Sequence, residues 1–243
     1  MLLPALEGTR NVLSAVAAAP SPLRPRRVVL TSSCAAVKGK TSPSPPSNGI
    51  SYTEADWNTT SSVDANGEAY WVSKTTAERL AWDMAKQHGL DVVTICPEFV
   101  IGPPVSATNC ASTSVGFMKG WLEGTPSEGR LTFAADVRDV ARAHFLAAIT
   151  PAAHGRYIVA DTRSVDPAFV SAVLSARFPG LAIPVGESVP EDAGAFLVDG
   201  SHARNELGLR PRPLDETLVD MAVVLIALGV AKPKAKDRAK KAA

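Results

Sequence analysis

Tyr70 and Lys74 lie four residues apart, at the start of a segment with helical periodicity. That offset places a phenol and an ammonium group on one face of a helix. An ammonium one helical turn away favours phenolate over phenol, so the tyrosine of such a pair gives up its proton more readily. It can then protonate a carbonyl oxygen while hydride reaches the carbonyl carbon. By itself the spacing is weak evidence, because many helices carry it by chance.

Two serines, Ser32 and Ser33, follow the short apolar, β-branched run 28–31. Such a run is typical of a central parallel strand that is buried on both faces. Open α/β sheets place their ligand sites at the carboxyl ends of the strands, so a serine there can hydrogen-bond a substrate carbonyl. The alternative is that both serines only end the strand and bond local backbone.

The rest of the chain predicts alternating helices and strands. We expect a helix over 2–18, a second over 68–88 that ends at Gly89, and a buried strand over 90–96 halted by Pro97. Helix, glycine turn and apolar strand in this order form the second half of a βαβ unit. Later segments are expected as helices at 114–122, 137–149, 165–178 and 216–228, and as β or apolar segments at 131–135 and 156–160.

Composition excludes several classes of protein. The 25 Lys and Arg residues against 24 Asp and Glu give a formal charge of +1, so no nucleic-acid partner is expected. Cys34, Cys96 and Cys110 have neither disulfide nor zinc spacing, which suits a reducing, cytoplasmic compartment. The histidines show no metal-ligand spacing, and His144 is expected to pack or to cap a helix. No apolar run reaches the roughly 18 residues that span a bilayer, so no membrane partner is expected.

Several ordered motifs resemble one family of enzymes. They are Pro4–Leu13, Val28–Ser33, Tyr52–Trp57, Tyr70–Glu78, Cys96–Pro103, Asp136–His144, Leu207–Leu209 and Leu214–Asp220. On these motifs the chain resembles the extended short-chain dehydrogenase/reductases of the NAD-dependent epimerase/dehydratase superfamily, and within them the dihydroflavonol reductase and cinnamoyl-CoA reductase-like group. The resemblance implies an α/β fold: a partial doubly wound parallel sheet, Rossmann-like with its first βαβ units missing, and a smaller, mainly helical C-terminal substrate region.

The resemblance also implies roles for matching residues. Ser33 would polarise the carbonyl, Tyr70 would donate the proton, and Lys74 would hold the nicotinamide ribose and tune Tyr70. The implied cofactor is NADP, with NAD possible, and the implied partner is a small aldehyde, ketone or acyl-CoA carbonyl compound. The residues implied to contact the cofactor are Thr31, Ser32, Tyr70, Lys74, Pro97, Glu98, Phe99 and Val100, with 97–100 beside the nicotinamide ring.

The same resemblance divides the chain. Residues 1–105 and 136–162 would form the C-terminal half of a dinucleotide-binding Rossmann domain, and 106–135 with 163–230 the substrate-binding region. Residues 231–243, rich in lysine and alanine and without an apolar face, are expected to be a basic, disordered tail.

The chain departs from the family pattern in two ways. It contains no Gly-rich turn of the kind that cradles a cofactor pyrophosphate. We therefore expect an N-terminally truncated fragment that lacks on the order of 80 to 100 residues, at about 30 per βαβ step. Strand 28–31 would then have an exposed apolar edge, making the chain aggregation-prone and a poor binder of dinucleotide.

The second departure concerns the substrate. Cinnamoyl-CoA reductases carry the run Asn-Trp-Tyr-Cys-Tyr-Gly-Lys around the catalytic tyrosine, whereas residues 68–74 here read Glu-Ala-Tyr-Trp-Val-Ser-Lys. Lys38 stands where plant dihydroflavonol reductases often have an asparagine. A Pro/Ser-rich insertion at 42–48 is expected to add surface loop.

Three other functions compete with a carbonyl reductase. A nucleotide-sugar epimerase or dehydratase, or a hydroxysteroid dehydrogenase, is disfavoured by the Trp57 motif and the C-terminal signature. A non-catalytic relative that serves as redox sensor or interaction module is disfavoured because Ser33, Tyr70 and Lys74 are all present. A non-functional gene product is the third. The sequence predicts neither the physiological substrate nor the oligomeric state.

Overall fold

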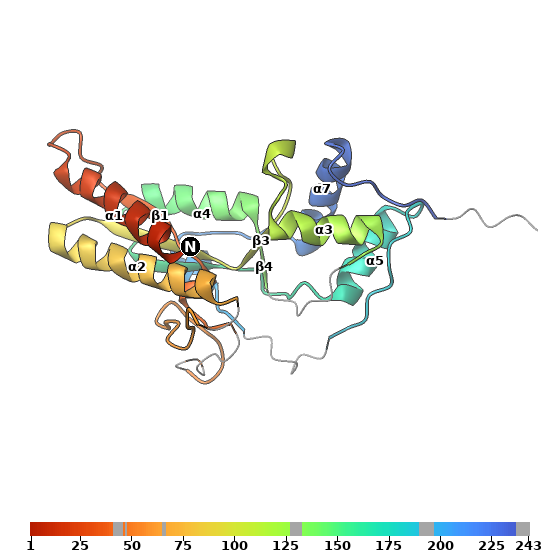
Figure 1. The fold of residues 1–243 in the computed structure, drawn as a ribbon, viewed down its shortest axis with the longest axis horizontal. Coiled ribbons are helices and arrows are strands. Elements are labelled where there is room, and N and C mark those ends of the chain that lie inside the picture. The colour runs from red at the N-terminus through yellow and green to blue at the C-terminus, as the bar shows by residue number, and fades with distance from the viewer. Residues whose placement is uncertain (41–45, 47, 65–66, 127–132, 190–196, 237–243) are drawn as a thin grey trace, which may run out of the picture. The chain divides into compact units, whose positions relative to one another are not determined.

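The computed structural model describes residues 1–40, 46, 48–64, 67–126, 133–189 and 197–236 (Figure 1). The chain divides into two units. The first comprises Met1–Glu98, Asp139–Ala160 and Phe196–Arg210, and the second Phe99–Arg138, Asp161–Ala195 and Pro211–Ala243.

A three-stranded parallel sheet forms the centre of the first unit. Its strands lie in the order β1 (Val28–Thr31), β2 (Val92–Pro97) and β5 (Gly155–Val159). Every residue of β2 is buried, because this apolar strand has a neighbour on each side. The expected strands are therefore present, although β2 begins two residues late and includes Pro97 instead of ending before it.

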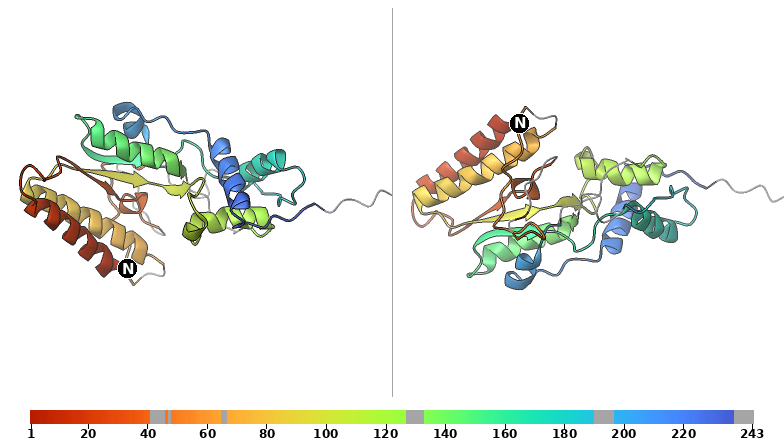
Figure 2. Two further views of the ribbon diagram at one scale, coloured as in Figure 1. Left: turned by 90° about the horizontal axis from the view of Figure 1, so that it is seen from above. Right: turned by 90° about the horizontal axis from the view of Figure 1, so that it is seen from below.

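Helices cover both faces of this sheet (Figure 2). On one face lie α1 (Leu2–Ala18) and α2 (Ala69–His88), on the other α4 (Val137–Ile149) and α6 (Ser201–Glu206). Buried Leu13 of α1 packs with Ala81 and Met84 of α2, and partly buried side chains of β1 pack against them. Helix α2 ends where the sequence predicted, because Gly89 adopts the left-handed conformation with φ of 59°.

Strand β1 has an unpaired edge in the described part of the sheet, since its one neighbour there is β2. Val28 N and Ser32 N donate to carbonyls of the β2 segment, so the alternating residues Val29 and Thr31 direct their backbone groups to the other side. The three apolar residues of β1 are half-buried and Thr31 is exposed. Within the described residues β1 thus lies at the edge of the sheet, as predicted, with its apolar side chains half-buried.

The second unit packs helices around a short parallel pair, β3 (Phe99–Ile101) and β4 (Ala134–Asp136). The helices are α3 (Thr113–Glu123), α5 (Pro167–Arg177) and α7 (Leu214–Ala227), each within three residues of its expected bounds. Its buried core includes Ile101, Met118, Leu122, Leu174, Leu218 and Leu225. Strand β3 was not expected, because three residues are too few for a periodic pattern.

Several segments differ from the domain boundaries predicted from the sequence. Residues 99–105, 136–138 and 161–162, expected in the Rossmann domain, belong to the second unit. Residues 197–210, expected with the substrate-binding region, belong to the first unit, where Val198 forms a parallel bridge with Tyr52 and α6 packs on β5. Residues 231–236, expected in a disordered tail, are held by backbone: Ala182 N donates to Lys234 O, and Lys236 N to Gly180 O. Most of the insertion at 42–48, and residues 237–243, lie outside the described residues.

Candidate active site

The carboxyl end of β1 carries Ser33. Its backbone is extended, and it caps a short 3-10 helix, η1 (Cys34–Ala36), by accepting a hydrogen bond at 3.1 Å from Ala35 N. This bond uses the oxygen of the hydroxyl group as acceptor and leaves its proton to be donated elsewhere. Ser33 is half-buried. The local-backbone role considered from the sequence is therefore present, together with a donor at the end of the strand.

The first turns of α2 carry Tyr70 and Lys74. The Lys74 Nζ atom lies 5.9 Å from the centroid of the Tyr70 ring, so the two side chains share a helix face as predicted. Tyr70 is 39% exposed, and its ring meets Trp71 edge to face at 5.4 Å. A phenol in this setting can reach a ligand from solvent, with a cation beside it.

Polar contacts bind the Ser33 segment to the loop 52–58 and to α2. Ala35 O accepts from Asn58 Nδ2 at 2.9 Å and from Thr75 Oγ1 at 3.4 Å, and Asn58 N donates to Ala36 O. Both Asn58 and Thr75 are buried. Thr75 directly follows Lys74, so the residues expected to be catalytic belong to one packed part of the first unit.

The other residues expected at the cofactor are placed differently from one another. Thr31 is exposed, and its Oγ1 lies 2.7 Å from Nε2 of His144, whose Nδ1 lies 2.8 Å from Val140 O. His144 thus packs against the strand end, as expected of it. Ser32 is buried, and its hydroxyl points inward to Glu78.

The segment 97–100 falls on both units. Pro97 ends β2, and the following Glu98 forms an ion pair with Lys38 at 2.6 Å, in which both side chains are largely buried. Lys38, noted in the sequence for replacing an asparagine, therefore has a carboxylate partner. Phe99 and Val100 belong to β3 of the second unit, so their position beside the nicotinamide stays a prediction.

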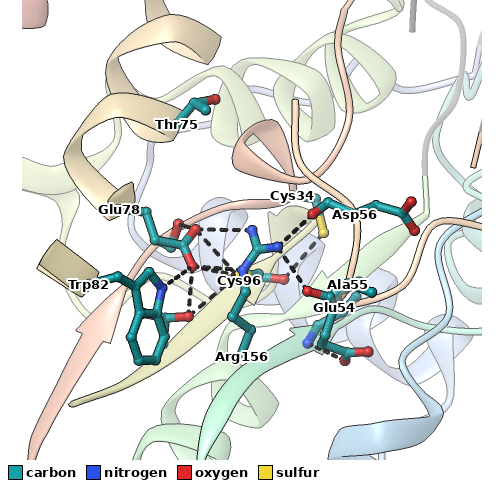
Figure 3. A network of polar contacts seen from close by, with 12 residues as sticks. Cys34, Glu54, Ala55, Asp56, Thr75, Glu78, Trp82, Cys96 and Arg156 are labelled. Atoms are coloured by element: carbon teal, nitrogen blue, oxygen red, sulfur yellow. Dashed lines mark hydrogen bonds and ion pairs between the residues drawn. The ribbon is translucent and has the colours of Figure 1, made fainter. Parts of the chain in front are cut away.

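Sequence reasoning missed a buried carboxylate on the same helix. Glu78 follows Lys74 by one helical turn and is 1% exposed. Its oxygens accept hydrogen bonds from Ser32 at 2.5 Å, Thr94 at 2.8 Å, Trp82 at 3.3 Å and two nitrogens of Arg156 at 2.8 and 3.1 Å (Figure 3). A glutamate on the buried side of α2 and an arginine inside an apolar strand were the available signals.

Arg156 extends this network to the loop 52–58. Its Nη1 donates to Glu54 O at 3.0 Å and to Asp56 O at 2.6 Å (Figure 3), and its guanidinium lies over the Trp57 ring at 3.9 Å. Burial by itself raises the pKa of Glu78. The hydrogen bonds and positive charge of Arg156, together with the hydrogen bonds from Ser32 and Thr94, nevertheless leave this pKa below its ordinary value.

The two buried cysteines carry no reactive thiolate. Cys34 and Cys96 are fully buried, and the Cys34 thiol donates to Cys96 O at 3.2 Å. Burial, and after it the charge of Glu78, raises the pKa of Cys96 to about 12. Burial likewise raises the pKa of Cys34. Neither buried thiol is therefore a candidate nucleophile. Among the described residues no cluster suited to a metal ion is found.

A parallel sheet with helices on both faces, a serine at a strand end and a Tyr/Lys helix beside it define a Rossmann-like, short-chain dehydrogenase/reductase type of fold. The family model described as "NAD dependent epimerase/dehydratase family" matches residues 4–160. The chain belongs to that family, as its motifs indicated.

Its relatives are reductases. Tetraketide alpha-pyrone reductase 1 of Arabidopsis thaliana is 33% identical over 232 residues, which cover 94% of this chain and 68% of the relative. Cinnamoyl-CoA reductase CAD2 of Medicago truncatula is 34% identical over 222 residues, covering 88% and 64% respectively. The chain thus spans about two thirds of the length of these curated relatives.

Solved structures of reductases share the fold of this chain. The crystal structure of yeast methylglyoxal/isovaleraldehyde reductase Gre2 complexed with NADPH superposes with a TM-score of 0.78 at 26% identity, over 94% of this chain and 72% of the other. Vestitone reductase from alfalfa shares the fold, with a TM-score of 0.73 at 24% identity. Within the described residues, none of the helices has the length and apolarity required to cross a membrane.

Proposed function

We propose that this protein takes part in the NADPH-dependent reduction of a small aldehyde, ketone or acyl-CoA carbonyl. The observation that carries the proposal is the pairing of Tyr70 and Lys74 on one accessible helix face, packed through Thr75 against the segment that begins at Ser33. The named activities of the relatives, reductases of carbonyl compounds, support the same reaction class.

Each side chain has a defined part in the proposed reaction. Bound NADPH would supply the hydride that forms the new C–H bond at the carbonyl carbon. Ser33 donates a hydrogen bond to the carbonyl oxygen, which concentrates positive charge on the carbon. Tyr70 gives that oxygen its proton, so an aldehyde or ketone becomes an alcohol. An acyl-CoA would become a hemithioacetal, which releases the coenzyme A thiol and leaves an aldehyde. Lys74 stabilises the resulting phenolate and holds the ribose hydroxyls.

The residues of the proposed site fit the nicotinamide ribose of the cofactor better than its pyrophosphate. Lys74 and Tyr70 offer donors to a nicotinamide ribose at the start of α2. A pyrophosphate needs clustered backbone N–H groups of a Gly-rich turn, and the 243 residues contain no such turn. We therefore propose weak dinucleotide binding by these residues, and assays need NADPH at millimolar concentration.

The test is the consumption of NADPH with a panel of aldehydes and ketones, followed by identification of the alcohol. We expect turnover that falls by about tenfold or more in Ser33→Ala, because one oxyanion donor is lost. Ser14→Ala, exposed on α1, is the matched control. Turnover that is equal in the three proteins would refute the role of Ser33. The same protein is also incubated with NAD+ and nucleotide sugars, and conversion of a sugar would favour the epimerase or dehydratase alternative. If coding sequence continues in frame before Met1, the longer protein is assayed beside this chain.

We also propose a cytoplasmic location for the protein. Its three cysteines are free thiols, and two of them are buried without a disulfide, which suits a reducing compartment. Imaging of a fluorescent fusion tests this, and a signal confined to the secretory pathway would contradict it.

A further inference from the structure

We propose that the buried Glu78 carboxylate is a positioning group for the reducing site: by fixing Ser32 and the rotation of α2, it sets how Ser33 faces Tyr70 and Lys74. This inference rests on the proposed function. It adds a residue that none of the sequence motifs assigned to the chemistry.

The first step of the argument is the strand end. Ser32 N donates to Ile95 O, and the Ser32 hydroxyl donates to Glu78 at 2.5 Å. Ser32 is therefore held through both its backbone and its side chain. Since successive side chains of an extended segment point to opposite sides, turning Ser32 inward turns Ser33 outward, toward the edge where ligands bind.

The second step is the helix. Tyr70, Lys74 and Glu78 follow one another at four-residue intervals, so they form one slowly turning stripe on α2. Hydrogen bonds hold the Glu78 end of this stripe to Ser32, which directly follows β1, and to Thr94 of β2. Arg156 of β5 holds the same carboxylate (Figure 3). Rotation of α2 about its axis would break all three ties, so the same carboxylate fixes where the other end of the stripe points.

The third step is the balance of charge and hydrogen bonds. The Arg156 guanidinium neutralises the charge of the Glu78 carboxylate. It also donates hydrogen bonds to Glu78 and to the backbone carbonyls of Glu54 and Asp56. A carboxylate enclosed in this way has one stable geometry. Its position four residues after Lys74 transmits that geometry to the reacting groups.

The test compares two hydroxyls that bond the same carboxylate. Ser32→Ala and Thr94→Val each remove one buried donor to Glu78, and Ser32→Thr restores the first. Each loss should lower the melting temperature by about 2 to 4 °C. Only Ser32→Ala should lower kcat, by about tenfold or more, because it frees the residue next to Ser33, and small misplacements of reacting groups slow chemistry. In Thr94→Val the bonds from Ser32 and Arg156 still hold Glu78 and with it the helix, so kcat should stay near that of the parent. KM for NADPH should stay within about twofold of the parent in both variants. Ser32→Thr should recover the parent kcat.

A second readout needs no activity. Hydrogen exchange is measured at the amides of Ala35 and Ala36, which donate to Ser33 Oγ and Ser33 O. We expect faster exchange in Ser32→Ala, by about tenfold, and parent-like exchange in Thr94→Val and Ser32→Thr. Equal kcat and equal exchange in Ser32→Ala and Thr94→Val would overturn the inference while leaving the proposed function standing. If the parent reduces no carbonyl, the proposed function fails, and the exchange comparison alone decides the positioning role.

Discussion

Helix α2 carries two kinds of functional group within three turns. Near its start, Tyr70 is 39% exposed and stands beside a lysine whose side chain reaches its ring. One turn after that lysine, Glu78 is 1% exposed and accepts hydrogen bonds from five residues. Both residues belong to one helix, and their exposure differs because Tyr70 faces solvent whereas Glu78 faces the strands of the sheet.

The difference in exposure between Tyr70 and Glu78 fits two different proposed roles, proton donation at Tyr70 and positioning at Glu78. Tyr70, for which we propose contact with a ligand, has access to solvent. A group that must hold geometry is enclosed and saturated. Substitutions at the accessible end should therefore change rate with little change in stability, and substitutions at Glu78 should change stability first.

The largest expected effect is on stability at the enclosed end. Glu78→Gln leaves Arg156 buried without its counter-charge and turns one acceptor into a donor. We expect the free energy of unfolding to fall by about 3 to 5 kcal/mol, measured by urea denaturation. Lys86→Gln, at an exposed position of the same helix, is the control and should stay within about 0.5 kcal/mol of the parent. Equal losses in both variants would break the comparison.

The accessible end should respond in rate. Lys74→Met removes the cation beside Tyr70 and a donor to the ribose, and we expect kcat/KM for the carbonyl substrate to fall by about 100-fold. Its free energy of unfolding should stay within about 0.5 kcal/mol of the parent. Full activity of Lys74→Met would contradict the expected role of Lys74. A loss of unfolding free energy as large as that of Glu78→Gln would show that the accessible and the enclosed part of α2 do not differ in their effect on stability.

Lowering the pH should reduce the stability that Glu78 contributes to the folded state. The folded state lowers the pKa of Glu78 from 4.5, so the unfolded chain binds this proton more readily. The stabilisation is fully present above that ordinary value and is lost as pH falls through the folded-state pKa. Each proton taken up on unfolding contributes about 1.4 kcal/mol per pH unit. Urea midpoints followed from pH 7 downward should show a shallower acid loss in Glu78→Gln, and parallel curves would contradict this.

The smallest expected effect is that of the cofactor on melting. Because the chain has no Gly-rich turn for the pyrophosphate, 1 mM NADPH should raise the melting temperature by less than about 1 °C. The accessible groups would then contribute only the nicotinamide end of the site. A rise of several degrees, measured by scanning fluorimetry, would show that these residues bind the dinucleotide well.

Much of this arrangement follows from local sequence. The apolar period of 2–18 and 68–88, the stop at Gly89 and the offset between Tyr70 and Lys74 are local, and the structure confirms them. The exposed edge of β1 was also predictable, because a buried-type strand without a second neighbour must leave one side open.

The rest depends on contacts between distant residues. Glu78 and Arg156 are 78 positions apart, so the sequence places each charge on a segment with a buried face but does not show that the two pair with each other. The inward-pointing Ser32 hydroxyl donates to the carboxylate of that same pair, which lies 46 positions further along the chain. Residues 231–236 were expected to be disordered from their composition, but they find backbone partners near Gly180. Strand β3 needs β4 beside it, since three residues do not form a strand alone.

The measurement that tests the central claim most directly is the turnover of Tyr70→Phe. This change removes one oxygen atom from an accessible side chain and leaves the ring beside Lys74. With the best carbonyl substrate of the panel and millimolar NADPH, kcat should fall by about 10² to 10⁴-fold, with an unchanged melting temperature. Turnover within about twofold of the parent would contradict the assignment of Tyr70 as the proton donor.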